Sequence, residues 1–284
     1  MSVVLGLVVG ALTVQFLRLG AADMLASPAL QRENYRGHRL PTAGGVLIVL
    51  SVLVVEAGRA VLGALGVGHD PGLTVARSEV LFAVFGFGLL GLVDDVLGDG
   101  SSRGFRGHLG ALLEGRITTG FLKLFGGAGI AVVLVATPGF ATGRRLLVDA
   151  VLIALAANLG NLLDRAPGRT IKAAAIAYVP LAFVLGTGTV GIAIAPALGA
   201  AFGLLGDDLH ERLMLGDAGA NVIGAVLGLG VVLGRGEATR ITALVALVVL
   251  NVAAELVSFS AVIDRVPWLR AVDRLGQLPD RRHP

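Results

Sequence analysis

The chain has 284 residues, of which 55% are hydrophobic and only 15% charged, and its mean hydropathy is +0.84. About a quarter of the residues of a soluble domain are charged, so this composition excludes an ordinary soluble protein. The absence of cysteine excludes disulfides, thiol catalysis and thiolate metal sites. The net charge of +3 indicates a basic cytoplasmic face and not a nucleic-acid partner, because aromatic residues make up only 5% of the chain.

Apolar segments follow one another from the N-terminus almost to the end of the chain. A helix needs roughly 20 apolar residues to cross a bilayer, and nine segments approach or reach that length. They cover residues about 2–17, 43–65, 79–97, 118–137, 146–163, 170–186, 188–206, 214–234 and 239–263. The first has no basic start and no small-residue cleavage pattern, so we interpret it as a retained helix and not a signal peptide. The sequence predicts an all-α, polytopic membrane protein with one domain over residues 1–284.

The orientation follows from the distribution of basic residues. Most of the 23 Lys and Arg residues fall on one side of the membrane if the N-terminus lies outside. Basic residues favour the cytoplasmic side, so we predict an outer N-terminus and a cytoplasmic tail at 264–284. The basic stretch 103–116 is then expected to contact anionic lipid at the inner surface of the cell membrane.

Polar residues gather at four places, all at predicted cytoplasmic helix ends. These are residues 36–45, 91–99, 158–169 and 206–221. Carboxylates near a membrane are costly unless they have partners or a function. Their convergence on one side predicts a functional site at the cytoplasmic face.

Asp94 and Asp95 end the third apolar segment. Two adjacent carboxylates repel each other, and a hard divalent cation such as Mg²⁺ relieves that repulsion, often together with substrate phosphates. The alternative is a pair of solvated aspartates at the membrane boundary.

Asn158, Asn161 and Asp164 occur at every third position of the fifth segment, which places them on roughly one face of a helix. Amides and a carboxylate arranged in this way can hold a nucleotide, a metal or each other. Hydrogen bonds between helices are the competing interpretation.

The eighth segment opens with a run of small and polar residues, Gly216, Asp217, Ala218, Gly219, Ala220 and Asn221. Free N–H groups at a helix start attract phosphate, and small side chains let a ligand approach the backbone. Residues 41–45 open the second segment with a similar pattern. Helix capping and close packing are the alternative for both patterns, and they explain residues 41–45 better than the start of the eighth segment.

Lys123 lies about one and a half turns inside the fourth segment. An ammonium at this depth can neutralise a phosphate group. It can also extend toward the lipid headgroups.

Four stretches taken together resemble the polyprenyl-phosphate N-acetylhexosamine-1-phosphate transferases. This superfamily includes phospho-MurNAc-pentapeptide translocase and the UDP-GlcNAc:undecaprenyl-phosphate GlcNAc-1-phosphate transferases. The stretches are 40–45, 91–95, 158–164 and 215–219, in the family's order and at similar spacing. The resemblance implies that a polyprenyl phosphate attacks the β-phosphorus of a UDP-sugar, releases UMP, and forms a polyprenyl diphosphate sugar for envelope polysaccharide or peptidoglycan.

The resemblance also implies roles for individual residues. It implies Mg²⁺, with Mn²⁺ as an alternative, held by Asp217 with Asp94 and Asp95. The implied catalytic group is Asp94, Asp95, Asp164 and Lys123, in which Asp94 deprotonates or orients the lipid phosphate and Lys123 neutralises the diphosphate. The implied substrate-binding positions are Asn158, Asn161, Asp207, Gly216, Gly219, Asn221 and Arg270.

The sequence departs from the family pattern near its end. Relatives carry a histidine-rich loop after the ninth helix, and here the matching region 264–274 contains no histidine. Arg265, Arg270 and Arg274 are expected to take over phosphate binding. Asp207 stands where relatives often have an amide, and Met214 where an aromatic often stacks on uracil. These departures indicate a divergent short branch.

Other classes of protein are weighed against this interpretation. A catalytically inactive relative that serves as a membrane scaffold is the main alternative. A secondary transporter should show an inverted repeat, and none is visible in the sequence. The pattern of CDP-alcohol phosphotransferases is also missing. The sequence leaves a homodimer open.

Overall fold

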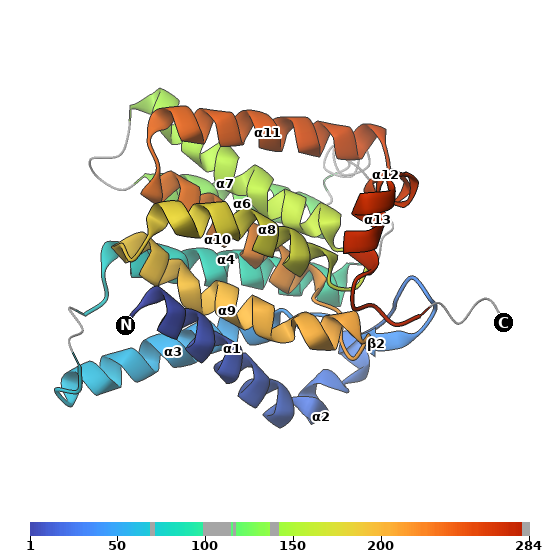
Figure 1. Cartoon of the computed structure of the whole chain (residues 1–284), viewed down its shortest axis with the longest axis horizontal. Helices are drawn as coiled ribbons and strands as arrows, with labels where there is room; N and C mark the ends of the chain where they lie inside the picture. The colour runs from blue at the N-terminus through green and yellow to red at the C-terminus, as the bar shows by residue number, and fades with distance from the viewer. Residues whose placement is uncertain (69–71, 99–114, 116–117, 137–141, 280–284) are drawn as a thin grey trace.

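The computed structural model describes residues 1–68, 72–98, 115, 118–136 and 142–279. Nine helices of 17 to 23 residues make up most of this described part and run side by side in a bundle (Figure 1). They are α1 (Val3–Gly20), α3 (Val46–Ala64), α4 (Val75–Leu97), α6 (Thr119–Val135), α7 (Gly143–Leu163), α8 (Arg169–Leu185), α9 (Thr189–Leu209), α10 (Gly216–Gly234) and α11 (Glu237–Leu256). The shorter elements are α2 (Ala22–Leu25), η1 (Pro28–Leu30), β1 (Gln31–Glu33), β2 (Arg39–Pro41), α12 (Phe259–Arg265) and α13 (Pro267–Arg274).

Each long helix lies on one of the nine apolar segments expected from the sequence. Seven of the described helices are long and apolar enough to cross a bilayer, whereas α6 is apolar but has only 17 residues. The helical, multi-pass membrane architecture is therefore confirmed. The number of nine spans and their orientation stay predictions.

Side-chain caps set where several helices begin. Thr74 accepts a hydrogen bond from the Arg77 N–H at the start of α4, and Thr118 accepts one from the Phe121 N–H at the start of α6. Such caps satisfy N–H groups that have no partner within the helix. The Thr74 cap explains why α4 begins at Val75, before the apolar segment that starts at about residue 79.

Two details of the secondary structure were not predicted. Within the helical architecture, β1 and β2 form an antiparallel hairpin with Arg32 opposite Leu40. The Asn34 carboxamide oxygen nucleates its turn by accepting from the N–H groups of Arg36 and His38, both at 2.9 Å. The last apolar segment, 239–263, is also not one helix. It breaks at Val257, which is extended, and Ser258 caps the new helix α12.

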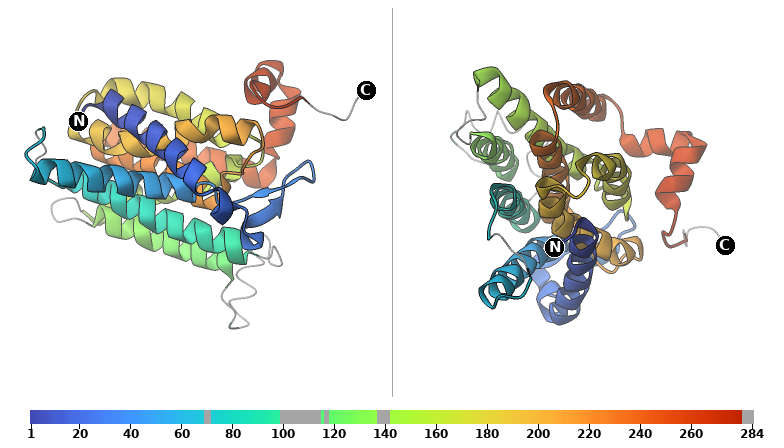
Figure 2. Two further views of the ribbon diagram at one scale, coloured as in Figure 1. Left: turned by 90° about the horizontal axis from the view of Figure 1, so that it is seen from below. Right: turned by 60° about the vertical axis from the view of Figure 1, so that its left-hand side comes forward.

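Helix α10 forms the centre of the bundle and is the most buried of the candidate spans. It packs against α4, α7, α8 and α9 (Figures 1 and 2). Glycine makes this possible: a Cβ at Gly160 would collide with the Ala220 carbonyl, and one at Gly224 would collide with the Ala156 carbonyl. Close approach through small residues is how helices gain packing energy in lipid, where apolar surface alone gives no advantage.

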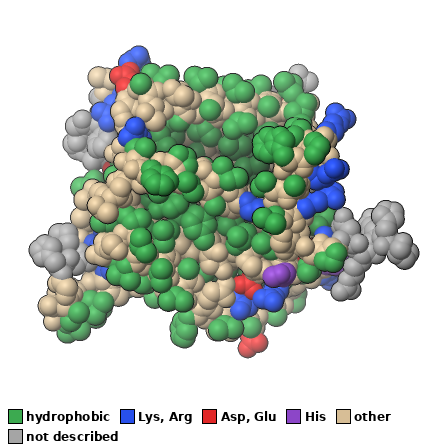
Figure 3. All heavy atoms as spheres, viewed as in Figure 1, with side chains coloured by type: hydrophobic (Ala, Val, Ile, Leu, Met, Phe, Trp, Pro, Cys, Tyr) green, Lys and Arg blue, Asp and Glu red, His purple; other side chains and the backbone are tan. Residues whose placement is uncertain are grey.

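The outer surface of the bundle is apolar, as a lipid-facing belt requires. Figure 3 shows hydrophobic side chains over most of one flank, with basic groups concentrated toward the ends. On α11, Val245 and Val249 are largely exposed. At the end of the bundle away from the hairpin, buried ion pairs join neighbouring helices, such as Arg240 with Asp149 at 2.8 Å and Arg77 with Glu56.

Candidate active site

Glycines from three separate motifs bring three helices together at the N-terminus of α10. A Cβ at Gly45 would collide with Gly219, and a Cβ at Gly91 would collide with the backbone of Asp217 and Ala218. The loop before α3 is bonded to the loop before α10, since the Gly45 N–H donates to the Leu215 carbonyl at 2.8 Å. The packing explanation of these glycines is therefore correct, and it places α10's first turn against α3 and α4.

Asp95 uses both carboxylate oxygens to cap α10. Its Oδ1 accepts from the Asp217 N–H and its Oδ2 from the Ala218 N–H, each at 3.0 Å. A carboxylate at this position also interacts favourably with the positive end of the helix dipole. The two adjacent aspartates thus differ: Asp95 holds the helix, and Asp94 is left facing the site.

Asp94, Lys123, Asn161 and Asp217 meet at one point, and they come from α4, α6, α7 and α10. Lys123 Nζ forms an ion pair with Asp217 and lies 3.7 Å from Asp94 Oδ2. With its amide turned to match these neighbours, Asn161 accepts from Lys123 Nζ at 2.7 Å and donates to Asp217. The carboxyl groups of Asp94 and Asp217 therefore both lie within reach of the same ammonium. We call these four residues the carboxylate–lysine cluster.

The cluster is accessible and carries excess negative charge. The side chains of Lys123, Asp217 and Asp94 are 17%, 19% and 25% exposed, so a ligand can reach them. Asp164 lies beside the cluster, close to the first turn of α10. Burial raises the pKa of the Asp164 carboxyl well above its usual range, and the nearby carboxylates of Asp208, Asp217 and Asp95 raise it further.

The oxygen donors of the cluster fit a hard divalent cation bound jointly with phosphates. Among the described residues, no group of three His, Cys, Asp or Glu side chains is arranged to hold a metal by itself. Mg²⁺ typically takes one or two carboxylates and completes its coordination with phosphates and water. Asp94 and Asp217 supply two carboxylates at one point, with the Asn161 amide next to them, whereas both oxygens of Asp95 are already engaged by α10.

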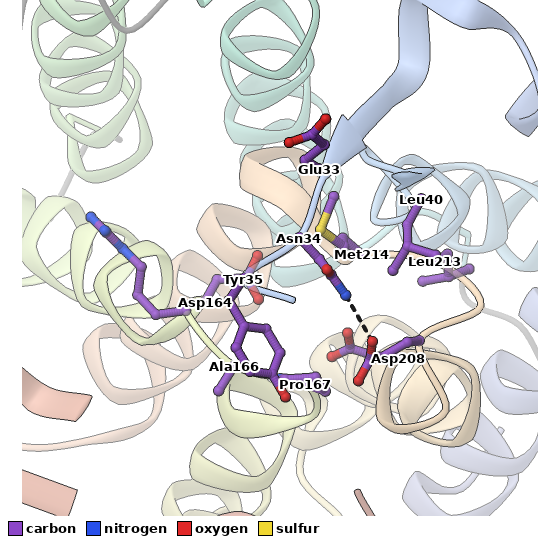
Figure 4. Close-up of a pocket in the computed structure, with 12 residues that line it drawn as sticks. Glu33, Asn34, Tyr35, Leu40, Asp164, Ala166, Pro167, Asp208, Leu213 and Met214 are labelled. Carbon is purple, nitrogen blue, oxygen red and sulfur yellow. Dashed lines mark hydrogen bonds between the residues drawn. The ribbon is translucent and has the colours of Figure 1, made fainter. Parts of the chain in front are cut away.

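A pocket of about 240 Å³ has Asp164 in its lining (Figure 4). Three segments form its walls: the hairpin, the α7–α8 turn and the α9–α10 turn. Its lining includes Tyr35, Asp164, Pro167, Asp208 and Met214. Asp164 lines this pocket and also lies near Asp217 and Asp95, so it is the residue that links the pocket to the surroundings of the cluster.

Glu211 fixes the hairpin over this pocket, a role that no sequence pattern indicates. Its buried carboxylate accepts from Asn34 Nδ2 at 2.8 Å and lies 3.1 Å from Arg36 Nε and 3.4 Å from His38 Nδ1. Glu211 has a φ of +53°, in the left-handed region that non-glycine residues rarely adopt. A polar residue in a polar loop has no periodic signal, so only the fold reveals these contacts.

A second, larger pocket of about 550 Å³ adjoins the first. Tyr35 and Arg165 line both pockets, and the rest of the second lies along the α11–α12 junction, residues 254–260, with Leu162 of α7. The two pockets therefore lie next to each other, with Tyr35 and Arg165 in the lining of both.

Two predicted site residues are engaged elsewhere. Asn158 donates to Asn251 of α11 at 2.7 Å, which is the interhelical hydrogen bond considered as its alternative role. Asp207 is buried against α1, where Arg18 Nε lies 3.0 Å away, and Arg212 pairs with its other oxygen at 3.2 Å. Neither lines the pocket beside the cluster.

The remaining predicted positions are more scattered. Gly216 and Gly219 lie in the first turn of α10, Asn221 is buried farther along it, and Arg270 is exposed on α13. Gly216 has a φ of +69°, and a Cβ there would crowd Asp95. The basic stretch 103–116 lies outside the described residues except for Gly115.

No protein-family model matches the chain. The chain is, however, similar to several curated proteins. It is 28% identical over 225 residues to a phospho-N-acetylmuramoyl-pentapeptide-transferase of Oceanobacillus iheyensis, an alignment that covers 70% of this chain and 64% of the relative. For the protein of that name in Deinococcus radiodurans the identity is 30% over 196 residues, covering 66% and 59%. For the one in Borreliella burgdorferi it is 24% over 268 residues, covering 82% and 72%.

These similarities show a distant superfamily relationship to the phospho-N-acetylmuramoyl-pentapeptide-transferases, in agreement with the resemblance of the four motifs. The chain spans less than two thirds of the length of the Oceanobacillus and Deinococcus relatives.

Proposed function

We propose that this distant relative of the pentapeptide transferases moves a sugar-1-phosphate from a UDP-sugar to a polyprenyl phosphate. The sugar is proposed to be an N-acetylhexosamine. The observation that carries the proposal is the carboxylate–lysine cluster, in which Asp94, Lys123, Asn161 and Asp217 from four helices meet beside a pocket. A structural role alone would not require so many polar groups at an accessible point in a membrane protein.

The proposed reaction is a displacement at phosphorus. An oxygen of the polyprenyl phosphate attacks the β-phosphorus of the UDP-sugar, the bond from that phosphorus to UMP breaks, and a polyprenyl diphosphate sugar forms. Asp94 is placed to orient or deprotonate the attacking phosphate, since one of its oxygens faces Lys123 across 3.7 Å. The Lys123 ammonium neutralises charge on the diphosphate and the departing UMP.

Asp217 and Asp94 would hold Mg²⁺, or Mn²⁺ in its place. Bound there together with the substrate's phosphates, the cation would supply neutralisation of phosphate charge. Asp95 contributes by fixing the first turn of α10, and hence Asp217, through its two hydrogen bonds.

The nucleotide-sugar is proposed to occupy the pocket under the hairpin. Asp164 connects that pocket to the cluster, and Asn161 lies one turn before it on α7. Tyr35 offers an aromatic ring and Met214 a polarisable side chain for the base. Arg270 stays a proposed phosphate ligand, although α13 holds it at the surface.

The polyprenyl phosphate is proposed to enter through the second pocket, from the side of the bundle. That pocket extends along the α11–α12 junction, where Leu256 and Val257 are exposed. The site is proposed to face the cytoplasm, in a protein of the cell membrane, and a homodimer is compatible with the exposed helix faces.

The competing proposal is an inactive scaffold for envelope assembly. Its supporting observation is that residues 264–274 contain no histidine. A scaffold has no need for an accessible lysine between two carboxylates, so the geometry favours the enzyme.

The deciding experiment measures UMP release by detergent-purified protein given undecaprenyl phosphate, Mg²⁺ and a panel of UDP-amino sugars. We expect UMP only when lipid, metal and the matching sugar are all present. Asp217→Asn or a chelator should abolish it, whereas Asp23→Asn, at an exposed carboxylate on α2, should not. Folded protein that releases no UMP with any donor would favour the scaffold.

A further inference from the structure

Two short helices follow the last long helix of the chain. Helix α11 stops at Leu256, and α12 and α13 follow after short breaks at 257–258 and at Val266. These two short helices turn away from the bundle at its hairpin end (Figures 1 and 2). They therefore begin where a membrane-spanning helix leaves the hydrocarbon.

One face of α13 is apolar and uncovered. Trp268, Val272 and Leu275 occur at i, i+4 and i+7, which places them on one face of a helix. Their exposed fractions are 68%, 43% and 71%, so nothing in the described part of the chain packs over this face. We call these three residues the tryptophan stripe.

The other side of α13 is tied firmly to the protein. Arg169 forms two bonds to the Asp273 carboxylate, at 2.7 and 2.9 Å, and a third to Ser260 at 2.8 Å. Lys172 Nζ donates to the carbonyl oxygens of Val272 and Asp273. Because the Arg169–Asp273 pair is nearly buried, the orientation of α13 is fixed and the tryptophan stripe is held outward.

Basic residues accompany the stripe. Arg265 and Arg270 are exposed, and Arg274 pairs only across the surface with Asp264 at 3.4 Å. Figure 3 shows Lys and Arg side chains with hydrophobic ones beside them along the edge that carries α12 and α13. An apolar face with tryptophan and an arginine-bearing flank is the pattern of a helix that lies in a membrane surface.

We propose that α13 lies in the plane of the membrane surface and inserts Trp268, Val272 and Leu275 at the boundary between headgroups and acyl chains. The occupant of the exposed face is the bilayer that already surrounds the bundle. Continuity with α11 brings the helix to that depth, and tryptophan prefers the interface because its ring is apolar while its N–H needs a polar partner. Arg265 and Arg270 are then within reach of anionic headgroups.

The composition of the chain makes a direct test available, because Trp268 is its only tryptophan. The full-length protein is reconstituted in vesicles of phosphatidylcholine and phosphatidylglycerol whose acyl chains carry bromine either near the headgroup or near the bilayer centre. We expect the shallow bromines to quench Trp268 fluorescence more strongly than the deep ones. No quenching by either lipid, or stronger quenching by the deep one, would overturn the proposal.

A matched pair of variants tests the stripe itself. Val272→Asp should lose about half or more of the shallow quenching, because it places a charge in the apolar face. Arg274→Asp places an aspartate on the polar side of the same helix and should retain it. Equal quenching in both variants, with unchanged thermal unfolding, would contradict an inserted stripe.

The same fluorescence separates the membrane from a second copy of the chain. If the stripe instead mediated contact between copies, Trp268 would escape the bromines and its emission would shift to longer wavelength when the protein is diluted into excess lipid. We expect emission that does not change with dilution. None of these readouts needs a substrate, so the result is independent of the proposed reaction.

Discussion

At the scale of single residues, the two adjacent aspartates have different tasks. Asp95 accepts two backbone hydrogen bonds from α10, and Asp94 faces Lys123. Losing a helix cap typically costs about 1 kcal/mol, up to 2. We therefore expect Asp95→Ala to lower the unfolding temperature in detergent clearly, and Asp94→Ala to abolish UMP release while leaving that temperature nearly unchanged.

Circular dichroism melting and the UMP assay, run on both variants, check this division. Asp95→Asn is the matched control, since its amide oxygen can still accept one of the two N–H bonds and should recover part of the stability. Equal losses of stability at positions 94 and 95 would show that the cap is not what distinguishes them.

The raised pKa of Asp164 predicts how the stability of the protein depends on pH. Its pKa in the folded protein is raised above the ordinary 3.8, so the folded state holds the proton more tightly than the unfolded state does. The metal-free protein should therefore lose stability as the pH rises above about 4, until the raised pKa is passed. Unfolding temperatures in a chelating buffer should show this fall, and Asp164→Asn should flatten it. An unchanged slope in the variant would assign the effect to other groups.

At the scale of elements, Glu211 is the residue that makes the most side-chain contacts to the hairpin. Its strands have three residues each, and a two-stranded hairpin is marginal alone. Glu211 holds it through Asn34, Arg36 and His38. We expect Glu211→Ala to speed amide hydrogen exchange over residues 31–41 and to raise the KM for the UDP-sugar by about tenfold, equivalent to ~1.4 kcal/mol, with a smaller change in kcat.

Glu211→Gln serves as the comparison, because it keeps an acceptor for Asn34 but loses the charge that faces Arg36 and His38. Its exchange rates should fall between those of the wild type and Glu211→Ala. If hydrogen exchange in the hairpin did not change in either variant, the positioning role of Glu211 would be wrong even if activity fell.

The sequence predicts the long helices of this protein well, because the apolar pattern extends over the whole length of each helix. All nine long helices coincide with apolar segments, because the requirement for some 20 apolar residues is strong and local. The hairpin was missed because its determinants are Asn34, whose oxygen organises the turn, and Glu211, which is far away in the sequence. The break at Val257 was missed because apolar residues continue through it.

The site was predicted unevenly for the same reason. Asp94, Lys123, Asn161 and Asp217 were each named from the sequence, yet nothing in it could show that Asp95 turns away to cap α10 or that Asn158 pairs with Asn251. Two residues of the same type in one motif can face different sides of a helix, and so have different partners. The catalytic roles of the four cluster residues stay predictions.

At the scale of the whole molecule, the carboxylate–lysine cluster and the two pockets lie at one end of the bundle. The predicted orientation makes that end cytoplasmic. The chain has no cysteine, so single cysteines can report on it. We expect an impermeant maleimide to label Glu237→Cys in intact cells and Arg39→Cys only after permeabilisation, because these exposed residues lie at opposite ends. The reverse pattern would invert the topology and place the site outside.

The contact between Gly45 and Gly219 has a consequence for how this protein can change over time. A methyl group on either glycine would strike the backbone of the other helix. At most tight contacts a larger residue on one side can be offset by a smaller one opposite, but glycine has no smaller counterpart. No second mutation at the facing position can therefore rescue the first. Both positions are therefore expected to remain glycine during evolution, even in lineages where the substrate and the residues lining the pocket diverge.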